Sequence, residues 1–182
     1  MSPSEPMSPS SPAPLAGRVE LLDVTEEILE KLLDVALADA AADDVTPPLG
    51  AAAGWNAERI SWFRDYHRAA AAGLDGPAAE KAWAISCGGR LAGSIRLKRT
   101  GTAAGAASTL ETGLWLGRSF RGRGVGREAL NLIRVAALGA GASVLQAETT
   151  AGNAAAQSLL RSAGAELAGD GVTTPLTARI TL

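Results

Sequence analysis

SFRGRGVGREAL, residues 119–130, joins a glycine-rich turn to an amphipathic helix and carries three arginines among three glycines. Glycine has no Cβ, so its backbone can approach a bound group closely, and the N-terminus of a helix favours negative charge. The stretch therefore predicts a phosphate site at the start of a helix. A glycine turn beside a solvated arginine face is the alternative explanation for the same residues.

Two common phosphate motifs do not fit this stretch. A P-loop needs Gly-Lys followed by Ser or Thr, and the stretch has no lysine and no hydroxyl at that place. Gly122, Gly124 and Gly126 alternate, whereas a dinucleotide fold needs the spacing G-x-G-x-x-G. A predicted three-strand meander also precedes the loop, where a dinucleotide fold would open with a βαβ unit.

Apolar periodicity and turn signals predict the element order βααβββαβαββ. The predicted helices span 26–42, 55–72, 125–138 and 153–163, and Gly88-Gly89 between two apolar runs predicts a hairpin over 81–99. The third helix is expected to bury Val125, Ala129, Leu132, Ile133 and Ala136. An α/β (α+β) domain over residues 16–182 follows, with a mixed sheet and helices on both faces.

The composition narrows the class of protein. The chain has 182 residues, of which 47% are hydrophobic, and a formal net charge of −2, which argues against a general nucleic-acid or anionic-membrane binder. A single cysteine, Cys87, excludes an internal disulfide and a multi-cysteine metal site. No apolar run is long enough to span a bilayer and no secretory signal is visible, so we expect a cytoplasmic protein. We also expect no bound metal. Residues 1–15 are expected to form a disordered Ser/Pro-rich tail, in which Met7 is an alternative start.

Arg121-x-x-Gly124-x-Gly126, after a strand and before a helix, resembles the pyrophosphate loop of the GNAT N-acetyltransferases. LETGLWLGRSFRGRGVGREAL (110–130) resembles the strand and loop of the ribosomal-protein, RimJ/RimL-like, branch, and ETTAGNAAAQSLLRSAGAEL (148–167) is similar to the family's strand and Asn-capped helix. The resemblance implies the GNAT fold, with a twisted, mostly antiparallel sheet of about six or seven strands.

The same resemblance implies an enzyme that moves the acetyl group of acetyl-CoA directly to a primary amine. The pantetheine arm would lie between the parallel strands 109–116 and 144–149, against the backbone of Leu114, Trp115 and Leu116. The Leu116 N–H is the candidate donor to the thioester oxygen. The residues expected to bind the cofactor further along are Arg121, Gly122, Arg123, Gly124, Val125, Gly126 and Asn153. Asn153 has a second role as a helix cap, and the two roles can coexist.

Glu111 matches the strand glutamate of the family and is expected to be the general base, although an ordinary strand residue is the alternative. The tyrosine that serves many members as general acid is replaced by Leu160, so no acid is assigned.

The acceptor is expected to be a protein or peptide N-terminus or a small cationic amine. The acidic residues Asp39, Asp43 and Asp44 and the aromatic cluster 55–67 fall in the family's acceptor wall, but a helix end and a core-facing aromatic stripe explain them more simply. A non-catalytic acyl-CoA sensor or interaction module is the alternative function. The C-terminal strand 177–182 leaves a homodimer open.

Overall fold

The computed structural model describes residues 17–100 and 108–182, so the tail expected over 1–15 lies outside the described residues. Within them, seven strands form one sheet in the order β1-β2-β3-β4-β5-β7-β6. The strands are β1 (Val19–Asp23), β2 (Glu80–Cys87), β3 (Arg90–Arg99), β4 (Thr109–Leu116), β5 (Val144–Thr149), β6 (Glu166–Ala168) and β7 (Leu176–Thr181). Neighbours are antiparallel except β4 and β5, which are parallel. The expected mixed, mostly antiparallel sheet is confirmed.

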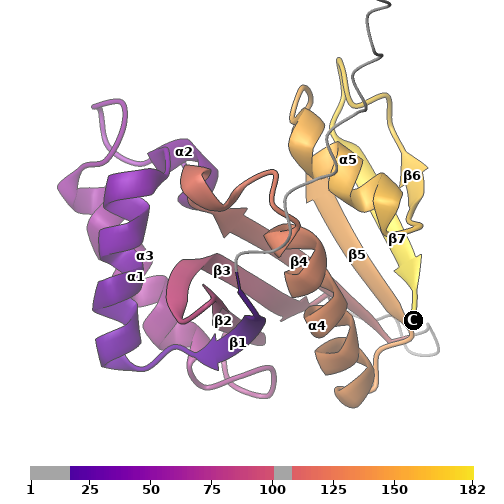
Figure 1. Ribbon diagram of the computed structural model, residues 1–182, viewed down its shortest axis with the longest axis horizontal. Coiled ribbons are helices and arrows are strands. Elements are labelled where there is room, and N and C mark those ends of the chain that lie inside the picture. The colour runs from indigo at the N-terminus through magenta and orange to yellow at the C-terminus, as the bar shows by residue number, and fades with distance from the viewer. Residues whose placement is uncertain (1–16, 101–107) are drawn as a thin grey trace, which may run out of the picture.

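Helices cover both faces of this sheet (Figure 1). They are α1 (Glu26–Asp39), α2 (Ala42–Val45), α3 (Ala57–Ala70), α4 (Val125–Gly139) and α5 (Ala154–Ser162), with a 3-10 turn, η1 (Arg118–Phe120). Leu29, Leu33 and Phe63 from α1 and α3 form the core on one face. The core on the other face contains Val125 and Ile133 of α4.

The helix predicted over 26–42 is wrong at its end, because the structure has two helices there. α1 ends at Asp39, and Ala40 is extended, with φ −136° and ψ 148°. The Ala40 carbonyl accepts a hydrogen bond from Trp55 Nε1 at 3.1 Å, fifteen residues further on. A tertiary contact therefore takes the place of the helical bond, and alanine-rich sequence gives no local sign of it.

The predicted buried face of α4 is also partly wrong. Leu130 and Ala137 are buried on the sheet, whereas Leu132 is 37% exposed and Ala136 only partly buried. Leu132 and its neighbours Val135 and Leu138 lie on the outer face of the helix. The apolar residues of α4 cover more than one stripe, so periodicity alone placed the centre of the buried face about one position away.

The C-terminal strand β7 lies between β5 and β6 and pairs with both. Both of its edges are thus occupied within the chain, and the homodimer stays a prediction without support from this strand. In the described part of the chain, no helix is both long and apolar enough to cross a membrane.

Candidate functional site: a cleft between two diverging parallel strands

A cleft opens where β4 and β5 separate. Their pairing runs from Thr109–Val144 to Thr112–Ala147 and stops there, although both strands continue. Figure 1 shows the strands close at one end and apart at the other. The cleft has a volume of about 810 Å³, and its walls are the separated strand ends, the loop after β4, the first turns of α4 and most of the length of α5. The separation expected for these two strands is therefore present.

The backbone of β4 offers hydrogen-bonding groups to this cleft. Gly117 N–H donates to Ala92 O on the β3 side at 2.8 Å, and facing residues of antiparallel strands alternate between bonded and non-bonded pairs. Trp115 is therefore bonded to β3, whereas Leu114 and Leu116 turn their N–H and C=O groups toward β5. Leu114 can bond an extended group in the cleft through its N–H and C=O, and Leu116 through its N–H, because Leu116 O accepts a hydrogen bond from Arg121 Nε at 3.0 Å. Trp115 also lines the cleft.

The loop after β4 places main-chain donors at the open end of the cleft. Gly122 and Gly124 have φ values of 68° and 82°, in the left-handed region that glycine enters at little cost. Gly124 is the N-cap of α4, and no side chain among the described residues caps this helix. The first-turn N–H groups and the positive end of the helix therefore lie beside the cleft wall formed by Gly122, Gly124 and Gly126. This arrangement suits an anion.

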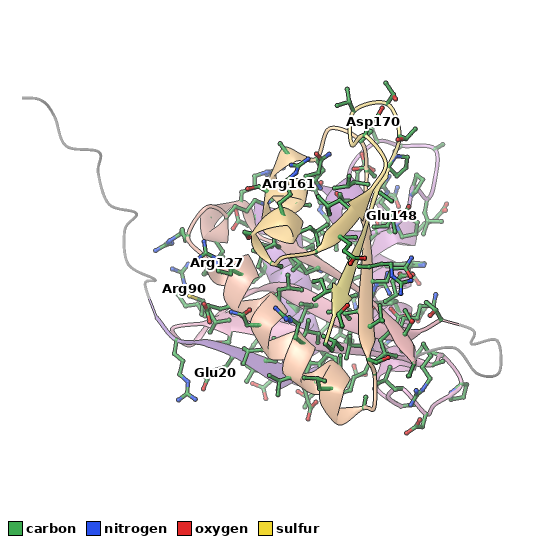
Figure 2. All side chains as sticks on the ribbon, turned by 90° about the vertical axis from the view of Figure 1, so that its right-hand side faces the viewer. Glu20, Arg90, Arg127, Glu148, Arg161 and Asp170 are labelled. Atoms are coloured by element: carbon green, nitrogen blue, oxygen red, sulfur yellow. The ribbon has the colours of Figure 1, made fainter. Side chains whose placement is uncertain are left out.

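Two arginines of the stretch 119–130 line the cleft, namely Arg121 and Arg127. Arg127 lies on α4 and is labelled in Figure 2. Arg121 Nη2 lies 3.0 Å from Asp44 Oδ2, so the guanidinium is already paired. The side chains of Arg123 and Val125, which were also expected to bind the cofactor, point away from the cleft. Arg123 donates to a main-chain oxygen of η1 at 3.2 Å, and Val125, the first residue of α4, is buried in the core.

Asn153 begins α5 on the opposite wall of the cleft. Its Oδ1 accepts a hydrogen bond from Ala156 N at 3.1 Å, so the expected role as a cap is confirmed. Leu160, at the position of the family tyrosine, is 5% exposed and packs with Ala147 and Ala178. This side chain carries no proton to donate.

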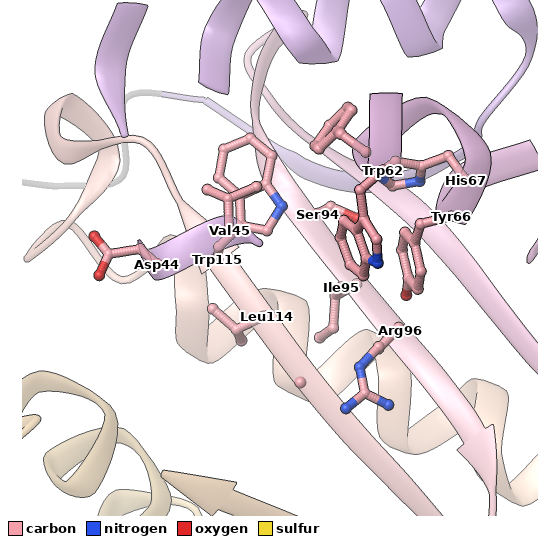
Figure 3. Close-up of a pocket in the computed structure, with 12 residues that line it drawn as sticks. Asp44, Val45, Trp62, Tyr66, His67, Ser94, Ile95, Arg96, Leu114 and Trp115 are labelled. Atoms are coloured by element: carbon pink, nitrogen blue, oxygen red, sulfur yellow. The ribbon is translucent and has the colours of Figure 1, made fainter. Parts of the chain in front are cut away.

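A second, smaller pocket of about 230 Å³ adjoins the cleft. Asp44, Gly113, Leu114 and Trp115 line both cavities. The pocket lies between α3 and the strands β3 and β4, and aromatic rings form much of its wall (Figure 3). The rings are those of Trp62, Phe63, Tyr66, His67 and Trp115, and Trp62 stacks on Tyr66 at 5.1 Å between centroids.

Arg96, at the floor of this pocket, links two carboxylates. Its Nη2 donates to Glu111 Oε1 at 2.6 Å, its Nε lies 3.4 Å from Glu80 Oε1, and its buried Nη1 has no hydrogen-bond partner among the described residues. Tyr66 donates its hydroxyl proton to Glu80 at 2.7 Å. Burial, followed by this hydrogen bond, raises the pKa of Tyr66, so this phenol is a poorer acid than usual.

Glu111 is therefore held by an arginine, and it does not line either cavity. Sequence reasoning missed a second carboxylate, Glu148, which lines the large cleft and is exposed. Figure 2 labels it on β5. Gln146 pairs with Glu111 in parallel register. Glu148, two residues further along β5, therefore faces the same side of the sheet as Glu111 and lies level with Gly113. Within the described residues it makes no ion pair. The period of two along β5 was the signal that could have found it.

The buried imidazole of His67 gives a pH-dependent stability. Burial lowers its pKa from the ordinary 6.5 to about 4, and its Nδ1 has no hydrogen-bond partner within the described residues. Between these values the unfolded chain binds a proton that the folded chain does not, so stability falls as the pH drops from 6.5 toward 4. The free energy of unfolding decreases by about 3 kcal/mol over this pH range.

Urea unfolding of the wild type and His67→Phe between pH 7 and about pH 4 measures this loss. Since His67 is the only histidine in the chain, the variant should have a flatter dependence in this window. Equal pH dependence in the two proteins would contradict the assignment.

Among residues 17–100 and 108–182, no cluster of three or more His, Cys, Asp or Glu side chains is placed to hold a metal ion. The glycine loop at a helix start that no side chain of the described residues caps, and the parted parallel strands, are two features that the resemblance to the GNAT acetyltransferases predicted. The family model for the acetyltransferase (GNAT) domain matches residues 18–166, and the chain belongs to this family.

Solved structures share the fold at low identity. RimL, a ribosomal-protein α-N-acetyltransferase in complex with coenzyme A, is 16% identical, with a TM-score of 0.68 over 93% of this chain and 97% of that one. Mycobacterium smegmatis RimJ, in complex with a CoA disulfide, is 18% identical, with a TM-score of 0.71 over 92% and 83%. The microcin C7 self-immunity acetyltransferase MccE, in complex with acetyl-CoA and AMP, is 17% identical, with a TM-score of 0.66 over 90% and 92%. No curated protein matches the chain.

Proposed function

We propose that this protein transfers the acetyl group of acetyl-CoA directly to a primary amine. The observation that carries the proposal is the cleft itself, with the backbone of Leu114 and Leu116 along one wall and an uncapped helix start at one end. The pantetheine arm fits the first feature, because its amides need hydrogen-bond partners, and the pyrophosphate fits the second. Acetyl-CoA supplies an activated acyl group when bound. The structures of RimL and MccE, which contain CoA and acetyl-CoA, support this cofactor.

The acceptor amine reaches the cofactor from the aromatic pocket, which meets the cleft at Gly113, Leu114 and Trp115. Glu80 and Glu111 contact Arg96 from outside the pocket lining, and these two carboxylates outnumber the arginine, so the charge beside the pocket is negative and favours a cationic amine. An acceptor with a carboxylate next to its amine would add a third negative charge. A peptide N-terminus instead brings a neutral carbonyl, for which the buried Arg96 Nη1 is a matching donor.

The ammonium must lose a proton before it attacks, and two carboxylates can accept it. Glu111 is the base expected from the sequence, but it would have to leave Arg96. It also lies five residues before Leu116, about 16 Å along an extended strand, so Leu114 N–H is the better-placed thioester donor if Glu111 is the base. Glu148 lines the cleft and is level with Gly113. The geometry favours Glu148.

No side chain is assigned as the general acid. A thiol has a pKa of about 8.5, so the thiolate can leave without one. Ser158 lines the cleft but is a weak acid, and Tyr66 lies in the acceptor pocket with its proton donated to Glu80. The cytoplasmic location remains an expectation from the sequence.

Calorimetric titration with acetyl-CoA and an assay of amine-dependent thiol release test the proposal. The amine panel contains short peptides with free N-termini, polyamines, free amino acids and aminoglycosides. We expect saturable binding, and turnover that is faster with peptides and polyamines than with free amino acids. Binding without turnover on the whole panel would favour an acyl-CoA sensor, and failure to bind any CoA would contradict the proposal.

A further inference from the structure

Asp44 occupies a junction between the two cavities. It lies on α2 and lines both the large cleft and the aromatic pocket. The other shared residues, Gly113, Leu114 and Trp115, are uncharged, so Asp44 is the charged group at this junction. In Figure 3 it lies across the pocket from Tyr66 and Arg96. A carboxylate here can contact groups bound in either cavity.

In the structure Asp44 is paired with Arg121 of the glycine loop. The distance from Arg121 Nη2 to Asp44 Oδ2 is 3.0 Å, and Arg121 Nε donates to Leu116 O, also at 3.0 Å. Both side chains of the ion pair are nearly half exposed, with 41% of Arg121 and 46% of Asp44 accessible. An exposed pair of this kind is weak and can exchange partners.

Arg121 is placed so that Asp44 and an anion bound in the cleft would compete for its guanidinium. Arg121 lines the cleft beside Gly122 and Gly124, where the pyrophosphate is proposed to bind. Phosphate oxygens form strong, charge-assisted bonds with arginine. A pyrophosphate at the loop therefore draws Arg121 away from Asp44, and Asp44 is left as an unpaired carboxylate at the mouth of the acceptor pocket.

We propose that Asp44 is exchanged between two partners: it holds Arg121 while the cleft is empty, and it binds the ammonium of the acceptor once the cofactor engages Arg121. This inference rests on the proposed function, because it needs a CoA pyrophosphate at the loop. The exchange makes the two sites cooperative, since the cofactor frees the carboxylate that the acceptor needs. By linkage the acceptor favours the cofactor by the same factor.

The neighbouring acidic residues are held by partners that the cofactor does not compete for. Asp43 lies 2.7 Å from the guanidinium of Arg59, whose side chain is only 5% exposed. Asp39 accepts hydrogen bonds from the main-chain N–H and the hydroxyl of Ser119, and these bonds lower the pKa of Asp39. Of the three acidic residues in this segment, Asp44 is therefore the one that the cofactor can release.

Calorimetric titration with CoA alone tests the exchange without knowledge of the acceptor. Asp44→Asn removes the competitor for Arg121, so CoA should bind about two- to five-fold more tightly than to the wild type. Asp43→Asn is the matched control, because it removes the same charge one residue away in the wall of the same cleft. We expect a smaller change in the control, and thermal melting confirms that each variant is folded.

The double variant Asp44→Asn/Arg121→Gln completes a thermodynamic cycle. In the Arg121→Gln background, Asp44→Asn should change CoA affinity no more than Asp43→Asn does in the wild type. Equal gains from Asp44→Asn and Asp43→Asn, or a gain that persists without Arg121, would overturn the exchange while leaving the proposed function intact. A wild type that does not bind CoA would instead overturn the proposed function, and the exchange with it.

The acceptor side is tested with the most active amine of the panel. Asp44→Asn should raise the KM for this amine about ten-fold and leave the KM for acetyl-CoA unchanged or lower. A residue that merely supports the fold would raise both KM values when it is replaced. A raised KM for the amine without a raised KM for acetyl-CoA therefore indicates that Asp44 changes partners. An unchanged KM for the amine would overturn the acceptor role of Asp44.

Discussion

Gly124→Glu is expected to abolish measurable CoA binding, with a loss of at least about 100-fold in affinity. The substitution adds a carboxylate at the N-cap of α4, beside main-chain N–H groups that face the proposed pyrophosphate site. Two like charges brought together in a cleft cost several kcal/mol. Calorimetric titration with CoA on the wild type and the variant measures the effect.

A control must separate charge from backbone strain, because Gly124 has a φ of 82° and a glutamate there is strained. Gly141 has a φ of 81° in the turn after α4, and a Cβ added to it meets no atom within 4 Å. Gly141→Glu therefore carries the same strain and the same charge away from the cleft. We expect the two variants to melt at similar temperatures, and Gly141→Glu to bind CoA like the wild type. Equal CoA affinity of Gly124→Glu and Gly141→Glu would contradict the phosphate site.

Glu148→Gln is expected to lower kcat by about 100-fold or more, since general-base catalysis contributes about 10²–10⁴ in rate. The carboxylate lines the cleft level with Gly113 and has no ion-pair partner in the described part of the chain, so it is free to accept the proton of the amine. The loss should be confined to kcat, with CoA affinity retained. Steady-state rates with the best amine of the panel, measured from pH 6 to about pH 9, test this expectation.

Glu111→Gln is the decisive comparison, because Glu111 is the base expected from the sequence. The substitution removes the negative charge paired with Arg96 at 2.6 Å, so it should reduce stability as well as disturb the acceptor pocket. If Glu148 is the base, Glu111→Gln raises the KM for the amine and preserves the dependence of kcat on pH. If Glu111→Gln loses the dependence of kcat on pH and Glu148→Gln keeps near-normal rates, Glu111 is the general base.

Much of the fold could be predicted from local sequence, because the signals lie within single elements. Glycines and prolines end the predicted helices and strands, Gly88-Gly89 places the hairpin, and Asn153 caps its helix as expected. The start of α4 was predicted for the same reason, since a glycine with positive φ and free N–H groups are properties of a few neighbouring residues.

The errors arose where distant residues decide the outcome. The break between α1 and α2 depends on the bond from Trp55 to the Ala40 carbonyl, and the buried face of α4 depends on the shape of the sheet beneath it. Neither contact leaves a mark on the nearby sequence.

The sequence by itself determined the order of elements apart from the short helix α2, the glycine-rich turn between Arg121 and Gly126, and the resemblance to the acetyltransferase family. Only the tertiary structure decided which side chains meet. It paired Glu111 with Arg96 and Arg121 with Asp44, and it turned Glu148 into the cleft. The physical reason is that the charge state and reach of a carboxylate depend on neighbours from other elements. Strand register and helix packing bring those neighbours together across the sheet.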